Sequence, residues 1–256
     1  MKAGLIASAL GYRPERLVTI DDGFDFEVVV ADDTWVFRFP RRPVVEEALA
    51  IELELLPRLR DALPVEIPQF AFVSLDPFFV AYRLIRGDPL VDEDGDGVRA
   101  FLDALHAFDA TGLPVERPDW IAMYRRQCVE FERLVVPLLD ADTADRAHAL
   151  FAEVETLASF EPTLIHADLG PEHLLVRDGR LAGVIDWGDT RIGDPARDYS
   201  WLLNGPFPDW DVDDELRRRA QIYRRLAPWY GAHYGIFTNR PAVVERELAE
   251  IRSTLT

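Results

Sequence analysis

Three short polar stretches lie among apolar residues in the second half of the sequence, and their residue types suit acid–base or metal chemistry. His166-Ala167-Asp168 follows one strand-like run, His173 precedes another, and Asp186-Trp187-Gly188-Asp189 follows a third. Loops at strand ends hold side chains firmly while exposing them, as a catalytic site requires. Carboxylates can orient or deprotonate a hydroxyl and can bind a divalent cation. We therefore expect Asp168, His173 and Asp186 to converge.

The hydrophobic pattern predicts the elements that position these side chains. Residues 163–166 are strand-like, and residues 174–176 and 181–185 predict a hairpin around Asp178-Gly179 that returns Asp186 to the side of His173. The first third alternates as strands and the rest is mainly helical, which predicts an α+β fold. The expected N-terminal strands are 26–30, 34–39, 70–73 and 78–84, with a helix at 45–59; further helical faces lie within 4–10, 98–108, 124–135, 216–226 and 244–255.

The composition excludes several mechanisms. Of the 28 basic residues only Lys2 is lysine, which rules out a Walker A loop and an internal Schiff-base lysine, so a bound anion must be held by arginine. The net charge of −18 argues against nucleic acid as a partner and is compatible with a cationic substrate. The single cysteine, Cys128, favours a reducing, cytoplasmic compartment. No apolar run reaches the roughly 18 residues of a membrane helix, so we expect no membrane partner, and we assume a monomer.

The spacing of the polar motifs resembles that of the aminoglycoside phosphotransferase family. His-Ala-Asp at 166–168, a histidine five residues later, Ile-Asp-Trp-Gly-Asp at 185–189 and Ile-Gly-Asp-Pro at 192–195 together carry the resemblance. The family shares the bilobal protein-kinase-like fold. The resemblance therefore implies an N-terminal nucleotide-binding lobe at 1–86, with an antiparallel sheet and one helix. A larger, mainly helical lobe at 87–256 would carry catalysis and substrate binding.

The resemblance also implies roles for the polar residues. Asp168 would orient the acceptor hydroxyl, with deprotonation of that hydroxyl as a further role, while Asp186 would bind a Mg²⁺ that bridges the nucleotide phosphates. His166 would brace the neighbouring backbone, with a catalytic histidine as the alternative. His173 stands where the family commonly has asparagine as the second metal ligand, and is similar to the residue of macrolide and some aminoglycoside 2''-phosphotransferases. It would touch the metal, act through a metal-bound water, or orient Asp168.

Residues 36–41 resemble the family's strand that carries the phosphate-binding basic residue, which is usually lysine. Arg38 occupies this position, and its planar guanidinium suits phosphate oxygens. Helical periodicity selects its partner, because Glu52 falls near the centre of the apolar stripe of the helix at 45–59 and Glu54 on the opposite side. An inward carboxylate needs a cation, so we predict a buried Arg38–Glu52 pair.

Residues 84–90 resemble the family's hinge between the lobes. The base of ATP or GTP would bind backbone groups at or beside this hinge, and the expected residues are Ala81, Tyr82, Arg83 and Leu84. The loop at 22–26 has one glycine, unlike the protein-kinase loop, and its contacts with the triphosphate are unassigned.

These inferences predict a small-molecule O-phosphotransferase with an aminoglycoside-type acceptor. A macrolide phosphotransferase and a metabolic or biosynthetic sugar or amino-alcohol kinase of the same fold are the alternatives. A non-catalytic nucleotide-binding module would lack Asp168 or Asp186, and a protein kinase would show an activation segment after Asp186. The resemblance implies an acceptor pocket in the helical lobe, facing Asp168. Carboxylates pair with ammonium groups and aromatic rings pack on sugars. The candidate acceptor residues there are Asp189, Trp201, Asn204, Asp209 and Trp210.

Overall fold

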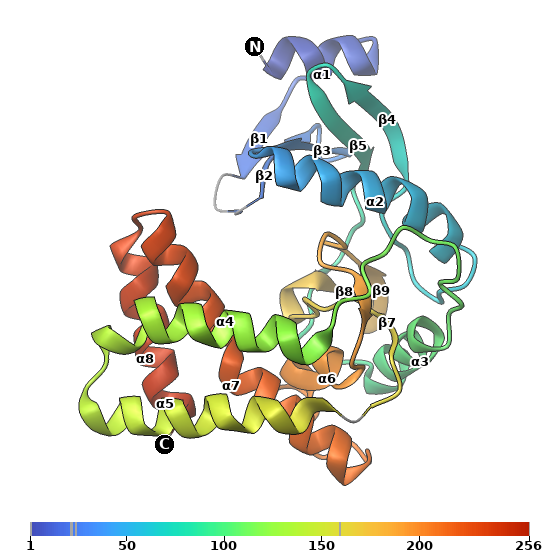
Figure 1. Ribbon diagram of the computed structural model, residues 1–256. Coiled ribbons are helices and arrows are strands. Elements are labelled where there is room, and N and C mark those ends of the chain that lie inside the picture. Colours follow the sequence, from blue (N-terminus) through green and yellow to red (C-terminus); the bar gives the residue numbers. More distant parts are fainter. Residues whose placement is uncertain (1, 21–22, 24, 159, 256) are drawn as a thin grey trace. The chain divides into compact units, whose positions relative to one another are not determined.

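In a computed structural model the chain has a mixed α+β structure, described here over residues 2–20, 23, 25–158 and 160–255 (Figure 1). The chain divides into two compact units. The first comprises Met1–Val115 and Gly170–Thr190, and the second comprises Glu116–Leu169 and Arg191–Thr256. Over the described ranges, every helix is too short or too polar to cross a membrane.

The first unit is built on a five-stranded antiparallel sheet of order β1-β2-β3-β5-β4. The four expected N-terminal strands are confirmed to within two residues. The strand at the β1 edge is short and mostly exposed, so it lacks the alternation that would have predicted it. The strands are β1 (Leu17–Ile20), β2 (Phe26–Ala31), β3 (Trp35–Pro40), β4 (Phe70–Leu75) and β5 (Phe78–Arg83).

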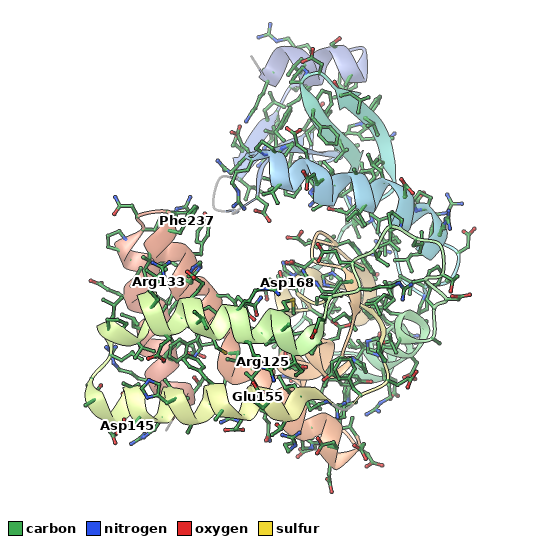
Figure 2. The ribbon with its side chains drawn as sticks, viewed as in Figure 1. Arg125, Arg133, Asp145, Glu155, Asp168 and Phe237 are labelled. Carbon is green, nitrogen blue, oxygen red and sulfur yellow. The ribbon has the colours of Figure 1, made fainter. Side chains whose placement is uncertain are left out.

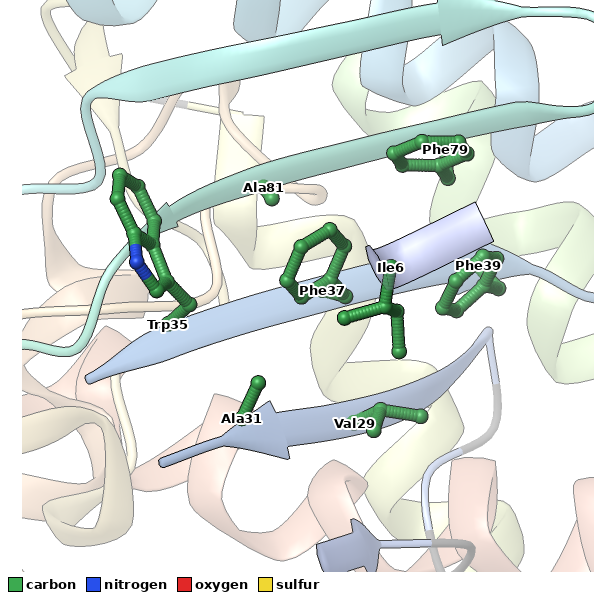
Figure 3. Packing of buried hydrophobic residues seen from close by; sticks show 8 residues of the cluster. All are labelled: Ile6, Val29, Ala31, Trp35, Phe37, Phe39, Phe79 and Ala81. Atoms are coloured by element: carbon green, nitrogen blue, oxygen red, sulfur yellow. The ribbon is translucent and has the colours of Figure 1, made fainter. Parts of the chain in front are cut away.

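Helices cover both faces of this sheet, which explains why β3 is buried along almost its whole length. The cluster beneath α1 (Lys2–Leu10) is shown in Figure 3 and consists of Ile6, Val29, Ala31, Trp35, Phe37, Phe39, Phe79 and Ala81. The cluster beneath α2 (Pro43–Leu59) contains Phe26, Val45, Leu49 and Val80. Because side chains alternate across a strand, Arg38 lies on the α2 face.

The predicted hairpin is present in a second sheet of the first unit, which has the strand order β6-β8-β9. Asp178 and Gly179 adopt positive φ angles of 55° and 72° at its turn, as a two-residue hairpin requires. The helix that follows β6 is capped at its N-terminus by Asp94, whose carboxylate accepts hydrogen bonds from the backbone N–H groups of Gly97 and Leu181. The elements are β6 (Asp88–Pro89), α3 (Gly95–His106), the 3₁₀ helix η3 (Pro171–His173), β8 (Leu174–Arg177) and β9 (Arg180–Val184).

The second unit is mainly helical. Its two short strands, β7 (Thr163–Ile165) and β10 (Arg191–Gly193), pair antiparallel. Gly193 permits close packing there, because a Cβ at this position would lie 2.3 Å from the ring of Trp120. The long α7 packs along α8 and also contacts α4 and α5 (Figure 1). The helices are α4 (Trp120–Leu134), η1 (Val136–Leu138), α5 (Ala141–Glu153), η2 (Val154–Ala158), α6 (Ala196–Leu202), α7 (Asp214–Phe237) and α8 (Pro241–Thr254).

Candidate active site

Arg38 and Glu52 form a buried ion pair on the α2 face of the five-stranded sheet. The Arg38 Nη1 donates to Glu52 Oε2 at 2.7 Å, and the two side chains are only 5% and 1% exposed. The Arg38 Nη2 is also buried, makes no hydrogen bond to any residue that the structure describes, and lies 3.6 Å from Asp186 Oδ1. One guanidinium edge is therefore fixed by the helix, while the other is available to a ligand.

The ionisation of this pair follows from burial and charge. Burial raises the pKa of the Glu52 carboxyl, and the nearby Arg38 charge offsets this only in part. Burial lowers the pKa of Arg38, but the charges of Glu52 and Asp186 outweigh that effect and leave the pKa above its ordinary value. Because a guanidinium does not lose its proton in proteins, Arg38 supplies a permanent positive charge at this point of the sheet.

The β8–β9 hairpin brings His173 and Asp186 together. The backbone N–H of Ile185 donates to the His173 carbonyl at 3.0 Å, which holds the two ends of the hairpin side by side. The Nε2 of His173 then lies 3.8 Å from Asp186 Oδ2. Asp186 has a positive φ of 63°, and its side chain is 51% exposed, so one carboxylate faces Arg38, His173 and solvent. Such a carboxylate can accept a cation without leaving its place.

Asp168 lies in the second unit, immediately after a backbone turn that is held from α6. Ala167 has a φ of 69°, which L-residues rarely adopt. The Asp198 carboxylate accepts hydrogen bonds from the backbone N–H groups of His166 and Ala167, at 3.0 and 2.8 Å. The Nε of Arg197 donates to the Ala167 carbonyl at 3.0 Å. These three bonds hold the strained turn and so set the position of Asp168.

His166 is fully buried in this turn, and its backbone N–H is one of the two groups that Asp198 holds. This bond holds the His166 backbone, and the bracing role expected of its side chain stays a prediction. The structure thus brings His173 and Asp186 together in the first unit and places Asp168 with His166 in the second. Convergence of Asp168 with the other two stays a prediction.

In the segment expected to bind the base, most backbone hydrogen-bonding groups are already used by pairing within the sheet. Ala81 pairs with Phe37 on one side and Phe72 on the other, and Tyr82 is likewise flanked by two strands. The backbone N–H of Leu84 donates to the Thr34 carbonyl at 2.8 Å. Arg83 has a partner in β3 only, so backbone groups from Arg83 onward are the ones that a base could reach.

The candidate acceptor residues differ in how far their side chains are already engaged. The Cζ of Arg224 lies over the ring of Trp201, 4.0 Å from the ring centroid. Trp210 stacks on Phe207. Asn204 donates from Nδ2 to the Ser200 carbonyl at 2.8 Å. Asp189 and Asp209 are exposed. Residues 22 and 24 of the loop at 22–26 lie outside the described residues, so its phosphate contacts stay unassigned.

Asp194 anchors a buried network in the second unit, and its long-range partners could not be predicted from the sequence. Asp194 is fully buried and accepts hydrogen bonds from Arg219 Nε and the Tyr223 hydroxyl, each at 2.8 Å. It also caps α6 through the Ala196 N–H at 3.0 Å, and Tyr223 accepts from the Trp120 indole. Apart from Ala196, the partners in this network are 25 or more residues apart along the chain, and no local pattern joins them.

The solved structures that resemble this chain include aminoglycoside and macrolide phosphotransferases. The GDP complex of wild-type aminoglycoside 2'-phosphotransferase-IIIa matches with a TM-score of 0.86 and 24% identity, over 100% of this chain and 99% of that one. Macrolide 2'-phosphotransferase from Brachybacterium faecium matches with a TM-score of 0.70 and 25% identity, over 98% and 96% of the two chains. The chain therefore has the kinase-like aminoglycoside phosphotransferase fold, as predicted.

Sequence comparison gives the family. Residues 16–233 match the APH phosphotransferase enzyme family, and the chain belongs to that family; it is a phosphotransferase with a hydroxyl acceptor. The uncharacterized protein YcbJ of Bacillus subtilis (strain 168) is 30% identical over 210 residues, which cover 70% of this chain and 67% of YcbJ. Viomycin phosphotransferase of Streptomyces vinaceus is 38% identical over 68 residues, which cover 25% of this chain and 24% of that protein.

Proposed function

We propose that this chain is a Mg²⁺-dependent enzyme that transfers the γ-phosphoryl group of ATP or GTP to a hydroxyl of an aminoglycoside-type acceptor. The observation that carries the proposal is the buried Arg38 Nη2. This atom lies next to Asp186 and has no hydrogen-bond partner among the described residues. A buried donor without a partner is costly, and a phosphate oxygen would satisfy it with a charge-assisted bond. A structural neighbour in complex with GDP and kanamycin supports both the nucleotide donor and the acceptor class.

In the proposed reaction the acceptor oxygen bonds to the γ-phosphorus as the bond to the β–γ bridging oxygen breaks. Asp168 accepts a hydrogen bond from the acceptor hydroxyl and takes its proton. Arg38 Nη2 donates to a phosphate oxygen, and backbone groups from Arg83 onward hold the base. Phosphoryl transfer needs alignment and charge neutralisation more than covalent chemistry, which suits residues held as rigidly as these.

The residues present also fit Mg²⁺. The half-exposed carboxylate of Asp186 is the hard oxygen donor that this ion prefers, and His173 stands beside it. Among the described residues, no group of three or more His, Cys, Asp and Glu side chains is placed so that it could hold a metal ion by itself. Mg²⁺ commonly completes its coordination with water and phosphate oxygens. We assign Asp186 as the metal ligand and keep His173 as a direct or water-mediated partner. When bound, the ion would neutralise charge on the phosphates.

We further propose that residues 1–86 form the nucleotide-binding lobe and residues 87–256 the catalytic and acceptor-binding lobe. The enzyme would act in the cytoplasm as a monomer. Asp189, Trp201, Asn204, Asp209 and Trp210 stay as candidate acceptor contacts, with Asp189 and Asp209 the ones whose carboxylates are exposed.

The test replaces the proposed catalytic aspartate. We expect Asp168→Asn to lower turnover by about 100- to 10,000-fold while ATP and GTP still raise the melting temperature, because the variant keeps the nucleotide contacts and loses the base. Asp145→Asn is the matched control, since Asp145 is exposed on α5 of the same unit (Figure 2). A wild-type chain that binds neither nucleotide, or an Asp168→Asn variant with full turnover, would overturn the proposal.

A macrolide acceptor is the second candidate, favoured by the 25% identity with the macrolide 2'-phosphotransferase of Brachybacterium faecium. Nucleotide consumption over aminoglycosides, macrolides and simple amino sugars separates the candidates. Turnover on macrolides alone would reverse the order, turnover on amino sugars alone would indicate a metabolic kinase, and nucleotide binding without any turnover would indicate a non-catalytic module.

A further inference from the structure

The guanidinium of Arg38 rests on an aromatic ring that no part of the proposed mechanism uses. Its Cζ lies 3.9 Å from the ring centroid of Phe26, at the start of β2. Phe26 is 8% exposed and packs with Val45 and Leu49 of α2 and with Val80, so the ring itself is held in place. The guanidinium is thus bounded by the ring on its face, by Glu52 at Nη1 and by Asp186 near Nη2.

The ring of Phe26 addresses a requirement that is specific to arginine, which is that the guanidinium plane must be oriented. The guanidinium is planar and presents its donors in fixed directions, whereas a lysine ammonium rotates freely and presents three equivalent donors. One hydrogen bond to Glu52 leaves the plane free to turn about that bond. The face of an aromatic ring attracts a cation and favours one orientation of the plane. In that orientation Nη2 remains 3.6 Å from Asp186 Oδ1, too far for a hydrogen bond, so both groups stay available to ligands.

We infer that Phe26 is a positioning residue for nucleotide binding: its ring orients the Arg38 guanidinium so that Nη2 meets a phosphate oxygen rather than closing on Asp186. The inference rests on the proposed function, because it assumes that Arg38 binds phosphate. It explains how arginine can bind phosphate at a strand position where lysine is usual. It also identifies Phe26 as the aromatic residue on which the replacement of lysine by arginine depends.

The test measures nucleotide affinity without metal, so that only the contacts of the protein are compared. GDP and ADP are titrated calorimetrically in Mg²⁺-free buffer into wild type, Phe26→Leu, Phe26→Tyr and Phe39→Leu. Phe26→Leu removes the ring face and keeps an apolar side chain, and Phe26→Tyr restores the face. Phe39→Leu is the matched control, because Phe39 is 5% exposed in the same sheet but belongs to the cluster beneath α1. The same Phe26→Leu change is also made in an Arg38→Lys background.

We expect Phe26→Leu to raise the nucleotide Kd by about 5- to 30-fold, Phe26→Tyr to restore it, and Phe39→Leu to lower the melting temperature with less than about a 2-fold change in Kd. In the Arg38→Lys background the effect of Phe26→Leu should fall below about 2-fold, because an ammonium has no plane to orient. The inference would be overturned by equal Kd changes for Phe26→Leu and Phe39→Leu. It would also be overturned if Phe26→Leu raised the Kd as much in the Arg38→Lys background as in wild type. Neither result would overturn the proposed function. A wild-type chain that binds neither nucleotide would instead overturn the proposed function and the inference with it.

Discussion

At the residue scale, the site depends on charges that are buried as pairs. Glu52 lies inside α2, and its carboxylate is acceptable there only because Arg38 is 2.7 Å away. Breaking one side of a buried pair leaves the other charge without compensation, which costs far more than the net contribution of the pair. The buried position of Glu52 and the exposed position of Glu54 follow from the helical period that selected Glu52 in the sequence.

This pair gives a stability prediction. Glu52→Gln keeps the shape of the side chain but leaves buried Arg38 with only the half-exposed Asp186, 3.6 Å away, as a counter-charge, so we expect the free energy of unfolding to fall by about 3 kcal/mol in urea titrations at neutral pH. Glu54→Gln, on the exposed side of the same helix, should change it by less than about 0.5 kcal/mol. Equal effects of the two substitutions would show that the pair does not stabilise the sheet.

At the element scale, α6 acts as the support of the Asp168 turn. Its first turn supplies Asp198 and Arg197, which hold the backbone of His166 and Ala167, and its start is capped by the buried Asp194. The Ile-Gly-Asp-Pro segment of the sequence therefore has a structural purpose. It starts a helix whose carboxylate reaches back about 30 residues to a strained turn.

We expect Asp198→Ala to lower the free energy of unfolding by about 2–5 kcal/mol, because two buried N–H groups lose their acceptors. The turn should then relax and misplace Asp168, so kcat should fall at least about 10-fold while the Kd for nucleotide stays near that of wild type. Denaturant titration measures the free energy of unfolding, steady-state kinetics measures kcat, and calorimetry measures the Kd for nucleotide.

Asp213→Ala is the control for this prediction. Asp213 caps α7 in the same unit, and its loss should cost about 1 kcal/mol without changing kcat. A stable Asp198→Ala variant with full kcat would contradict the supporting role of α6.

At the scale of the whole molecule, both units contain buried tyrosines whose protonated form the fold protects. Burial raises the pKa of Tyr82 to about 12 in the first unit, and burial also raises the pKa of Tyr124, Tyr223 and Tyr230 in the second. An unfolded chain releases these protons near pH 10, so over the interval above that pH the folded chain holds more protons than the unfolded one. For Tyr82, the stability from this source is complete below about pH 10 and is lost as the pH rises through about 12.

Alkaline unfolding should therefore depend on these tyrosines. Between about pH 8 and pH 11 the wild-type chain should lose stability, and Tyr82→Phe should lose about 1 kcal/mol less over the same interval. The measurement is the free energy of unfolding in guanidinium at each pH, with the value at about pH 8 as each variant's own reference. An identical loss in Tyr82→Phe and wild type would contradict the assignment to Tyr82.

The sequence by itself determined the local parts of this protein. Helical periodicity selected Glu52, strand alternation placed Arg38 on one face of the sheet, and Asp178-Gly179 set the hairpin that joins His173 to Asp186. These are short-range consequences of backbone geometry, so they can be read from neighbouring residues. Spacing then sufficed for the family resemblance, which the match over residues 16–233 confirms.

Only the tertiary structure decided which side-chain atoms are engaged by other residues and which are available to a ligand. Only packing shows that Nη1 of Arg38 is taken by Glu52 while Nη2 is not, that Phe26 lies under the guanidinium, and that Asp198 holds the turn before Asp168. Packing also occupies the rings of Trp201 and Trp210 with neighbouring side chains. Except for the stacking of Trp210 on Phe207, these contacts join residues that are distant along the chain, and they depend on the side-chain orientations that burial selects. No local pattern encodes them.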